Sequence, residues 1–325
     1  MTLEMPVAAE LPEGSYVDVA FEVERNYEGW RLDRYLTAKL KNFSRERAAA
    51  LVATARGDRR LKPSTRVHTG LRFVLRRPSR AEPPTPTEVP ILHRDEWIVV
   101  VDKPAGLPVH PNARYHLGTL VHVLRRAGVG AEPVHRLDRE TSGLVVCART
   151  AKVSCCFMHA FQRGEVHKQY LAICEGTPPD EFVVDAPLAV GGRIVRIAVR
   201  VDPESGRPAR TRFAVVRRFT RGETSFALLR AFPETGRQHQ IRAHLREAGF
   251  PIVGDKIYGP DEMIYDRFVR RALTPYDWSR LHLARHALHA YQLEFTHPGT
   301  GLRVRFEAPL AADLATFVND AATTI

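Results

Sequence analysis

The chain has 325 residues, of which 44% are hydrophobic and 26% are charged, a composition typical of a soluble globular protein. No run of about 18 apolar residues occurs, so we expect no membrane-spanning helix. The formal net charge of +11 favours a polyanionic partner, for which nucleic acid is the usual choice.

The chain starts with MTLEMPVAAELPEG, which is acidic and interrupted by proline, unlike a secretory signal peptide. The four cysteines, at positions 147, 155, 156 and 174, lack the spacing of a metal site, and we interpret them as reduced packing residues. These features predict a cytoplasmic protein. The length suggests about two domains.

The N-terminal part of the chain predicts a small helical domain after an unstructured leader, residues 1–24. Apolar residues from Leu32 to Leu40 recur with helical spacing, and Ser44 suits the N-cap of a second helix. Residues 67–75 alternate weakly, as a short strand does. Residues 25–77 are therefore expected to form a compact, helix-rich domain.

This domain resembles the S-four-type (alpha-L) RNA-binding domain of ribosomal proteins and RNA-modifying enzymes. The resemblance rests on RLDRYL at residues 31–36 and SRERAAALV at residues 44–52. After these motifs the chain reads ARGDRRLKPS, where the family usually has a glycine and a strand ending in Asn-Gly, so the domain is a degenerate member. The resemblance implies RNA binding, and a solvated charged face is the alternative.

A proline-rich segment separates this domain from the rest of the chain. Residues 78–90 contain five prolines and predict a semi-rigid linker. Beyond it, apolar runs such as residues 97–101 and 168–174 predict strands, and residues 311–318 predict a closing helix. Because strands outnumber helices, we expect residues 91–325 to form an α+β domain around a mixed, largely antiparallel sheet.

Residues 134–150, VHRLDRETSGLVVCART, join a charged segment to a continuous apolar run. The apolar half predicts a strand buried on both faces, and the charged half a loop at the edge of the core. Asp138 lies near Arg136 and Arg139 in sequence, so we expect its carboxylate to be ionised. A surface loop of ion pairs is the alternative.

Two further segments carry a recognisable pattern. Thr235 and Gln238 have the spacing of a capping box, at the start of a helix that would bury Ile241 and Leu245. Nine arginines against two acids between residues 193 and 221 predict strands with a basic face.

Seven segments of the second domain form an ordered set of motifs: DKPAGLPVHP at 102–111, HRLDRETSGL at 135–144, KQYLAICEG at 168–176, GRPART at 206–211, ETGRQHQIRAHL at 234–245, GDKIYG at 254–259 and LHAYQLEFTHP at 288–298. In this order they resemble the RluA-type RNA pseudouridine synthase family, over about residues 91–310. The resemblance implies the pseudouridine synthase fold and the isomerisation of uridine to pseudouridine in ribosomal or transfer RNA.

In this reaction the uracil is detached from the ribose, turned, and rejoined through carbon. The resemblance implies that Asp138 is the catalytic carboxylate, acting at the ribose by covalent attack or proton abstraction. Tyr170 would stack on the uracil and help to move a proton, and Arg242 would pair with Asp138. Arg136 would help to expel the base from the RNA. The residues implied in substrate binding are Arg136, His135, Arg237, His239 and Leu288.

The implied roles agree with elementary chemistry. Cleavage of a glycosidic bond builds positive charge on the sugar, which a fixed carboxylate stabilises, and a paired base must first be flipped out. The reaction is redox-neutral and adds no water, so we expect no metal and no cofactor. We expect RNA as the partner of a monomer, and no membrane.

Two other functions stay open at this point. A hydrolytic nucleosidase would need a second carboxylate, for which Glu140 is the near candidate. A non-catalytic RNA-binding protein would use the same surfaces without the reaction. The chain departs from the family at Gln238, where threonine is usual, and in residues 260–280, an insertion rich in aromatic and charged residues.

Overall fold

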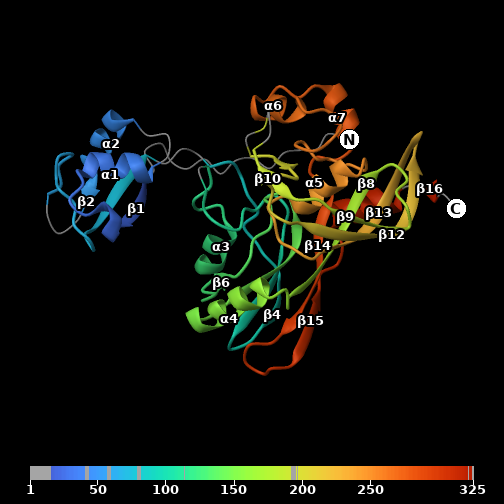
Figure 1. The fold of residues 1–325 in the computed structure, drawn as a ribbon, viewed down its shortest axis with the longest axis horizontal. Coiled ribbons are helices and arrows are strands. Elements are labelled where there is room, and N and C mark those ends of the chain that lie inside the picture. The colour runs from blue at the N-terminus through green and yellow to red at the C-terminus, as the bar shows by residue number, and fades with distance from the viewer. Residues whose placement is uncertain are drawn as a thin grey trace. The chain divides into compact units, whose positions relative to one another are not determined.

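The computed structural model of the chain describes two compact units, which divide between Pro84 and Thr85 (Figure 1). Among the residues that the structure describes, no helix is both long enough and apolar enough to cross a membrane. The described residues are 16–40, 44–56, 60–78, 82–112, 114–191, 195, 197–320 and 322–323.

The N-terminal unit packs two short α-helices against a three-stranded antiparallel sheet of order β1-β3-β2. Tyr35, Leu36 and Leu75 are fully buried in its core. Ser44 caps the second helix as expected, accepting a hydrogen bond from the Arg47 N–H at 3.2 Å. The elements are β1 (Tyr16–Glu22), η1 (Arg25–Tyr27), α1 (Leu32–Lys39), α2 (Arg45–Val52), β2 (Ala55–Arg56) and β3 (Arg72–Pro78).

The expected leader is wrong for the part that strand β1 occupies. β1 pairs with β3 along its whole length, and Phe21 stacks on Phe73 with ring centroids 5.2 Å apart. The sequence of the strand, YVDVAFE, alternates apolar and polar residues over part of its length, as a half-buried strand does. Residues 1–15 of that leader lie outside the described part of the chain.

An 11-stranded sheet organises the C-terminal unit, with the order β16-β12-β13-β8-β14-β7-β5-β4 and with β15, β6 and β9 attached at its sides. The pair β7–β14 is parallel, and the other pairs described in this sheet are antiparallel. The expected mixed, largely antiparallel sheet is therefore confirmed. The strands that form its centre are β5 (Ile98–Lys103), β7 (Ser142–Ala148), β8 (His167–Glu175), β12 (Arg210–Arg221), β13 (Thr224–Pro233) and β14 (Leu288–Thr296).

The remaining strands are short. Five of them belong to the main sheet, and β10 and β11 pair with each other in a separate two-stranded sheet. They are β4 (Ile91–Arg94), β6 (Glu132–Pro133), β9 (Glu181–Asp185), β10 (Leu188–Val190), β11 (Val199–Val201), β15 (Arg303–Glu307) and β16 (Ala322–Thr323).

Helices cover both faces of the sheet (Figure 1). α3 packs on one face of β5 and β7 and α4 on the other, so that β7 is buried along its whole length, as the sequence predicted. α5 and α8 share a core with β8, β12 and β13, while residues 260–280 contribute α6 and most of α7. The helices are α3 (Leu120–Arg126), α4 (Ala151–Gln162), α5 (Gln240–Glu247), α6 (Ile264–Val269), α7 (Pro275–Leu281) and α8 (Ala312–Asn319).

The parallel step between β7 and β14 depends on a glycine. Gly143 lies opposite Ala290 and has φ +107°, a conformation that side chains with a Cβ rarely adopt. A Cβ at this position would lie 2.3 Å from the Ala290 carbonyl oxygen. The close approach fixes the start of β7, and with it the charged loop that precedes the strand.

We predict that Gly143→Ala lowers the free energy of unfolding by about 3 kcal/mol, because it adds a steric clash to an unfavourable φ. Gly164→Ala is the matched control, since Gly164 has φ +72° but no atom within 4 Å of the added Cβ. Its loss should be about 1 kcal/mol. Urea unfolding followed by circular dichroism measures both, and equal losses would contradict this explanation.

Candidate active site

A pocket of about 180 Å³ opens between the loop that precedes β7, strand β8, and the segment that joins β13 to α5. It is lined by polar and cationic side chains together with Leu288 and a few other apolar residues. Seven of the eight site residues predicted from the sequence lie in its wall, namely Arg136, Asp138, Tyr170, Arg237, His239, Arg242 and Leu288.

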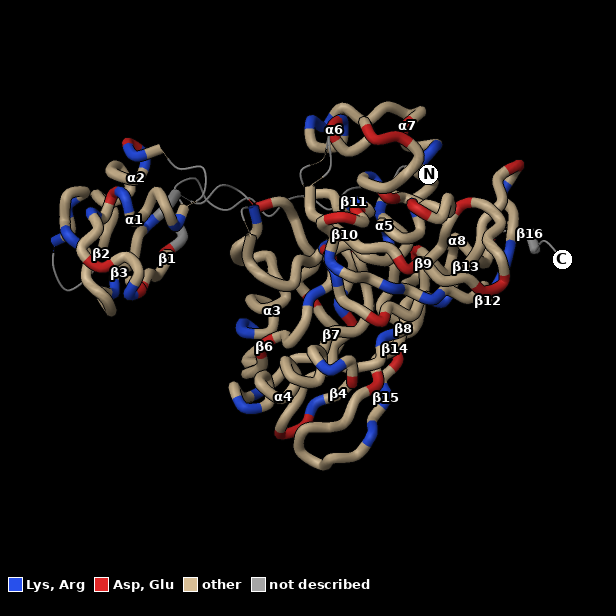
Figure 2. The backbone as a smooth tube through the Cα atoms, viewed as in Figure 1, with Lys and Arg blue, Asp and Glu red and all other residues tan. Residues whose placement is uncertain are grey.

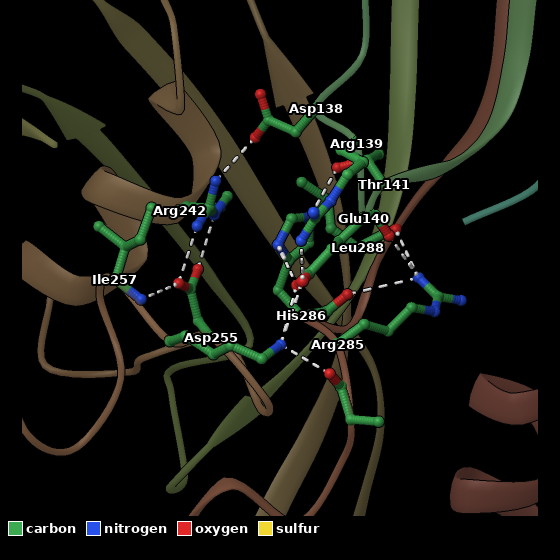
Figure 3. Close-up of polar contacts among 12 residues, drawn as sticks. Asp138, Arg139, Glu140, Thr141, Arg242, Asp255, Ile257, Arg285, His286 and Leu288 are labelled. Carbon is green, nitrogen blue, oxygen red and sulfur yellow. Dashed lines mark hydrogen bonds and ion pairs between the residues drawn. The ribbon is translucent and has the colours of Figure 1, made fainter. Parts of the chain in front are cut away.

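Arg242 lines this pocket and connects two carboxylates, as Figure 3 shows. Its Nη1 donates a hydrogen bond to Oδ2 of Asp138 at 2.8 Å. Its Nε and Nη2 bind both oxygens of Asp255, at 2.7 and 2.8 Å. Asp255 is fully buried and also accepts the backbone N–H groups of Ile257 and Tyr258. The bidentate pair fixes the guanidinium plane, which leaves one N–H directed at Asp138.

The charges of this group keep Asp138 ionised. Burial raises the pKa of a carboxyl group, but the adjacent Arg242 guanidinium outweighs that effect and holds the pKa of Asp138 at about 2. Asp255 is likewise shifted downward, because Arg242 and backbone N–H groups outweigh its burial. The Asp138 side chain is 20% exposed and the Arg242 side chain 5%, so the carboxylate is the part of the pair that reaches the pocket.

The loop that carries Asp138 is held by buried hydrogen bonds on both sides. Lys103 is fully buried, and its Nζ donates to the carbonyl oxygens of Pro104, Leu107 and Arg139 at 2.9 to 3.2 Å. Burial lowers the pKa of Lys103 to about 7. These contacts tie the end of β5 to the residue that follows Asp138.

A second set of contacts fixes the residues after Asp138 (Figure 3). Glu140 pairs with Lys256 at 3.1 Å, and its carbonyl accepts a hydrogen bond from Arg285. The Thr141 hydroxyl lies 2.7 Å from Nε2 of His286, whose pKa burial lowers to about 3. His286 is therefore neutral at neutral pH and serves as a hydrogen-bonding group.

Tyr170 lies on β8, with its ring on the face of the strand opposite Leu171, and borders the pocket. Burial, together with the charge of Asp138, raises the pKa of its hydroxyl. The phenol is therefore neutral at neutral pH, and its ring is available to stack on a planar ligand.

His135 differs from the other predicted site residues, because it does not line the pocket. Its Nε2 accepts the backbone N–H of Val146 at 3.0 Å, and its ring lies against Phe161 with centroids 5.4 Å apart. Burial lowers its pKa to about 3, so the ring is a neutral acceptor at neutral pH. The expectation that His135 contacts the substrate is not supported by this position, since the ring is used inside the protein.

The N-cap of helix α5 lies four residues after Thr235, the N-cap of the predicted capping box. His239 is its N-cap, with φ +54°, and the Thr235 hydroxyl instead donates to the side-chain oxygen of Gln240 at 2.7 Å. Gln238 lies on the pocket wall and donates to the carbonyl of Ile197. The capping-box prediction is therefore wrong, because Gln240, which the sequence did not single out, takes the hydrogen bonds of this turn.

Sequence reasoning also missed three charged residues of the site. Asp255 and Lys256 lie in the GDKIYG segment, which was matched to the family without a role for either residue, and Lys168 precedes Tyr170 by two positions. Lys168 lines the pocket, and burial lowers its pKa. A buried acid placed thirteen residues after Arg242 could not be distinguished from a surface acid without the fold.

The basic face expected from residues 193–221 is smaller than its composition suggests, because acids lie beside many of the arginines (Figure 2). Arg200 pairs with Asp202, Arg218 with Asp180, and Arg210 with two acids. Arg193 and Arg196 lie outside the described part of the chain.

The carboxylates of the site bear on the nucleosidase alternative. Among the described residues that line the pocket, Asp138 is the only acid. Glu140 is held by Lys256 and Arg139, which outweigh its burial and lower its pKa to about 2. A glycosidase requires a second carboxyl group that flanks the scissile bond, and Glu140 does not occupy such a place.

Elsewhere in the C-terminal unit, one group of side chains has the composition of a metal site. The ligating atoms of His93, Asp95 and His297 lie within 4.8 Å of one another. However, Nδ1 of His297 accepts the backbone N–H groups of Gly299 and Thr300, so its hydrogen is on Nε2 and points at Asp95. The group is a hydrogen-bonded cluster, since a metal would need that nitrogen deprotonated.

Comparison with known proteins gives consistent matches. A family model described as RNA pseudouridylate synthase matches residues 97–247. A protein of Nitrosomonas europaea named ribosomal large subunit pseudouridine synthase D is 34% identical over 318 residues, covering 91% of this chain and 86% of the relative. A protein of the same name from Pseudomonas aeruginosa is 35% identical, covering 90% and 92%. A Chloroflexus aurantiacus protein named uncharacterized RNA pseudouridine synthase is 37% identical, covering 87% of each chain.

Two solved structures share the fold. Human RNA pseudouridylate synthase domain containing 1 superposes with a TM-score of 0.58 at 22% identity, covering 75% of this chain and 91% of the human one. Human RNA pseudouridylate synthase domain containing 4 gives a TM-score of 0.55 at 25% identity, covering 73% and 95%.

Because the pKa values of Asp138 and Glu140 are lowered in the folded protein, we predict that the protein loses stability in acid. Unfolded Asp and Glu bind protons near pH 4, at about 3.9 and 4.3, whereas these two side chains in the folded protein do so near pH 2. Between about pH 5 and 2 the unfolded chain binds more protons, so the free energy of unfolding should fall steadily on acidification.

Urea unfolding across this pH range measures the effect, with Glu140→Gln as the comparison. The variant lacks one of the two depressed carboxyl groups, so its stability should decline less steeply with acid. A decline as steep as that of the unmodified protein would show that the Glu140 carboxylate is not stabilised by the fold.

Proposed function

The chain belongs to the RluA-type RNA pseudouridine synthase family, and from that premise we propose that its substrate is the RNA of the large ribosomal subunit. The enzyme isomerises uridine in RNA to pseudouridine. The substrate proposal follows the names of its relatives from Nitrosomonas europaea and Pseudomonas aeruginosa. Transfer RNA remains the second candidate.

One observation supports the proposed catalytic role of Asp138. It is the only acid among the described residues of the pocket wall, and Arg242 keeps it ionised while binding one of its two oxygens. The second oxygen is then available to the ribose. A negative charge fixed in this way stabilises the positive charge that develops on the sugar as the glycosidic bond breaks.

The reaction needs no external reagent. The C1′–N1 bond breaks with its electron pair on the uracil, the base turns, and a C1′–C5 bond forms. The proton lost from C5 balances the proton gained at N1. Asp138 would act at the ribose, by covalent attack or proton abstraction, and the neutral ring of Tyr170 would hold the base by stacking.

The remaining pocket residues are proposed to bind the RNA. Arg136 is an exposed cation and Arg237 a half-buried one on the pocket wall, both suited to phosphate contacts, and Arg136 would help to expel the target base. Leu288 would pack against the flipped nucleotide, and His239 would contact it as well. The N-terminal unit is proposed to be an S-four-type (alpha-L) domain that adds RNA affinity, in a monomer that works in the cytoplasm.

The proposal is tested with Asp138→Asn, which keeps the shape of the side chain and removes its charge. We expect pseudouridine formation to fall by a factor on the order of 10³ or more, while RNA binding changes little. Asp266→Asn is the matched control: Asp266 on α6 pairs with Arg270, whose side chain is exposed, and the variant should retain full activity.

Pseudouridine is mapped after incubation with large-subunit ribosomal RNA, small-subunit ribosomal RNA and transfer RNA separately. Product on large-subunit RNA alone is the expected result. Release of free uracil would favour a nucleosidase, and equal product from both aspartate variants would exclude the role of Asp138. Binding without product on every RNA would indicate a protein that no longer catalyses the reaction.

A further inference from the structure

The two oxygens of the Asp138 carboxylate differ in their contacts. Oδ2 accepts a hydrogen bond from Arg242, whereas Oδ1 has a longer contact with the His239 ring. Nη1 of Arg242 donates to Oδ2 at 2.8 Å, while Nε and Nη2 of the same guanidinium bind Asp255. A single hydrogen bond restrains rotation about the last torsion of the side chain only partly, because this torsion has a broad energy well. A second contact would narrow the range of directions open to Oδ1.

His239 lies where such a contact would come from. Its Nε2 is 3.7 Å from Oδ1 of Asp138, and its side chain is 9% exposed. Burial lowers its pKa to about 4, so the ring is neutral at neutral pH and the two groups do not form an ion pair. The effect of the ring on Asp138 therefore depends on which nitrogen carries the hydrogen.

Tyr258 determines that choice. Its hydroxyl oxygen accepts the backbone N–H of Val199 at 2.7 Å, and the same oxygen lies 3.0 Å from Nδ1 of His239. A phenol has one hydrogen to donate, and among the described contacts of this hydroxyl Nδ1 is the only possible acceptor for it. Nδ1 is then the acceptor, and the ring carries its hydrogen on Nε2, the nitrogen that faces Asp138.

We propose that His239 is a positioning residue for Asp138, whose Nε2–H sets the direction of the free carboxylate oxygen. The inference rests on the proposed role of Asp138 in the reaction. At 3.7 Å the contact is longer than a hydrogen bond, so it orients Oδ1 electrostatically without occupying the lone pair that the ribose needs. Arg242 binds Oδ2 of Asp138, and His239 orients Oδ1.

Two substitutions separate this role from a purely structural one. Glutamine places an N–H near the position of Nε2, whereas asparagine places it near the position of Nδ1, away from Asp138. The backbone of His239 favours the opposite order, because at φ +54° asparagine is more readily accommodated than glutamine. A structural role therefore predicts that asparagine is the better replacement, and a positioning role predicts glutamine.

We expect His239→Gln to retain kcat within about threefold and His239→Asn to lose on the order of tenfold to hundredfold, the usual effect of a misplaced catalytic group. KM should change by a similar factor in both variants, since each loses the same imidazole contact to the nucleotide. The Tm of the asparagine variant should equal or exceed that of the glutamine variant.

The tautomer is measured directly by nitrogen NMR of the histidine rings, with His239→Gln used to assign the signal. A neutral ring with its hydrogen on Nε2 at pH 7 is the expected result, and a hydrogen on Nδ1 would overturn the inference. Equal kcat in the two variants, or a rise in KM alone, would also overturn it. Either outcome, beside an inactive Asp138→Asn enzyme, would leave the proposed function standing.

Discussion

The site depends on one buried guanidinium that is shared by two carboxylates. Arg242 binds Asp255 in a bidentate manner and Asp138 through a single N–H. Removing either acid would destabilise the folded protein, because it takes away one of the two carboxylates that pair with the buried guanidinium, and a buried charge is costly when it is unpaired. Lysine could not replace Arg242, because a point charge lacks the planar set of donors that reaches both partners in fixed directions. The structure thus keeps an acid ionised in a pocket whose burial favours its protonation.

The fold brings these partners together from distant parts of the chain. Asp138 precedes β7 in a loop tied to β5 by Lys103, while Arg242 stands on the first turn of α5. Gly143 allows β14 to approach β7, which places the start of β14 beside the loop. A rigid sheet therefore carries the acid, and a helix at the pocket wall carries its counter-ion. Such placement on regular elements keeps catalytic groups in a defined geometry.

The features that the sequence predicted are those with a local signal. The run after Gly143 identified a fully buried strand, and ordered motifs identified the family and the Asp138–Arg242 pair. The features it missed are set by contacts across the chain. Strand β1 is defined by pairing with β3, the start of α5 by Gln240, and the second partner of Arg242 by the turn at Asp255. His135 matched a family motif, yet its ring bonds to Val146, which no spacing reveals.

Arg242 holds Asp138 ionised inside the pocket, and a carbon NMR titration of the Asp138 carboxyl group in the folded protein, assigned with Asp138→Asn, tests this directly. We expect a pKa of about 2, well below that of an exposed aspartate. A pKa near or above 4 would contradict it, because the carboxyl group would then be governed by burial and not by the guanidinium.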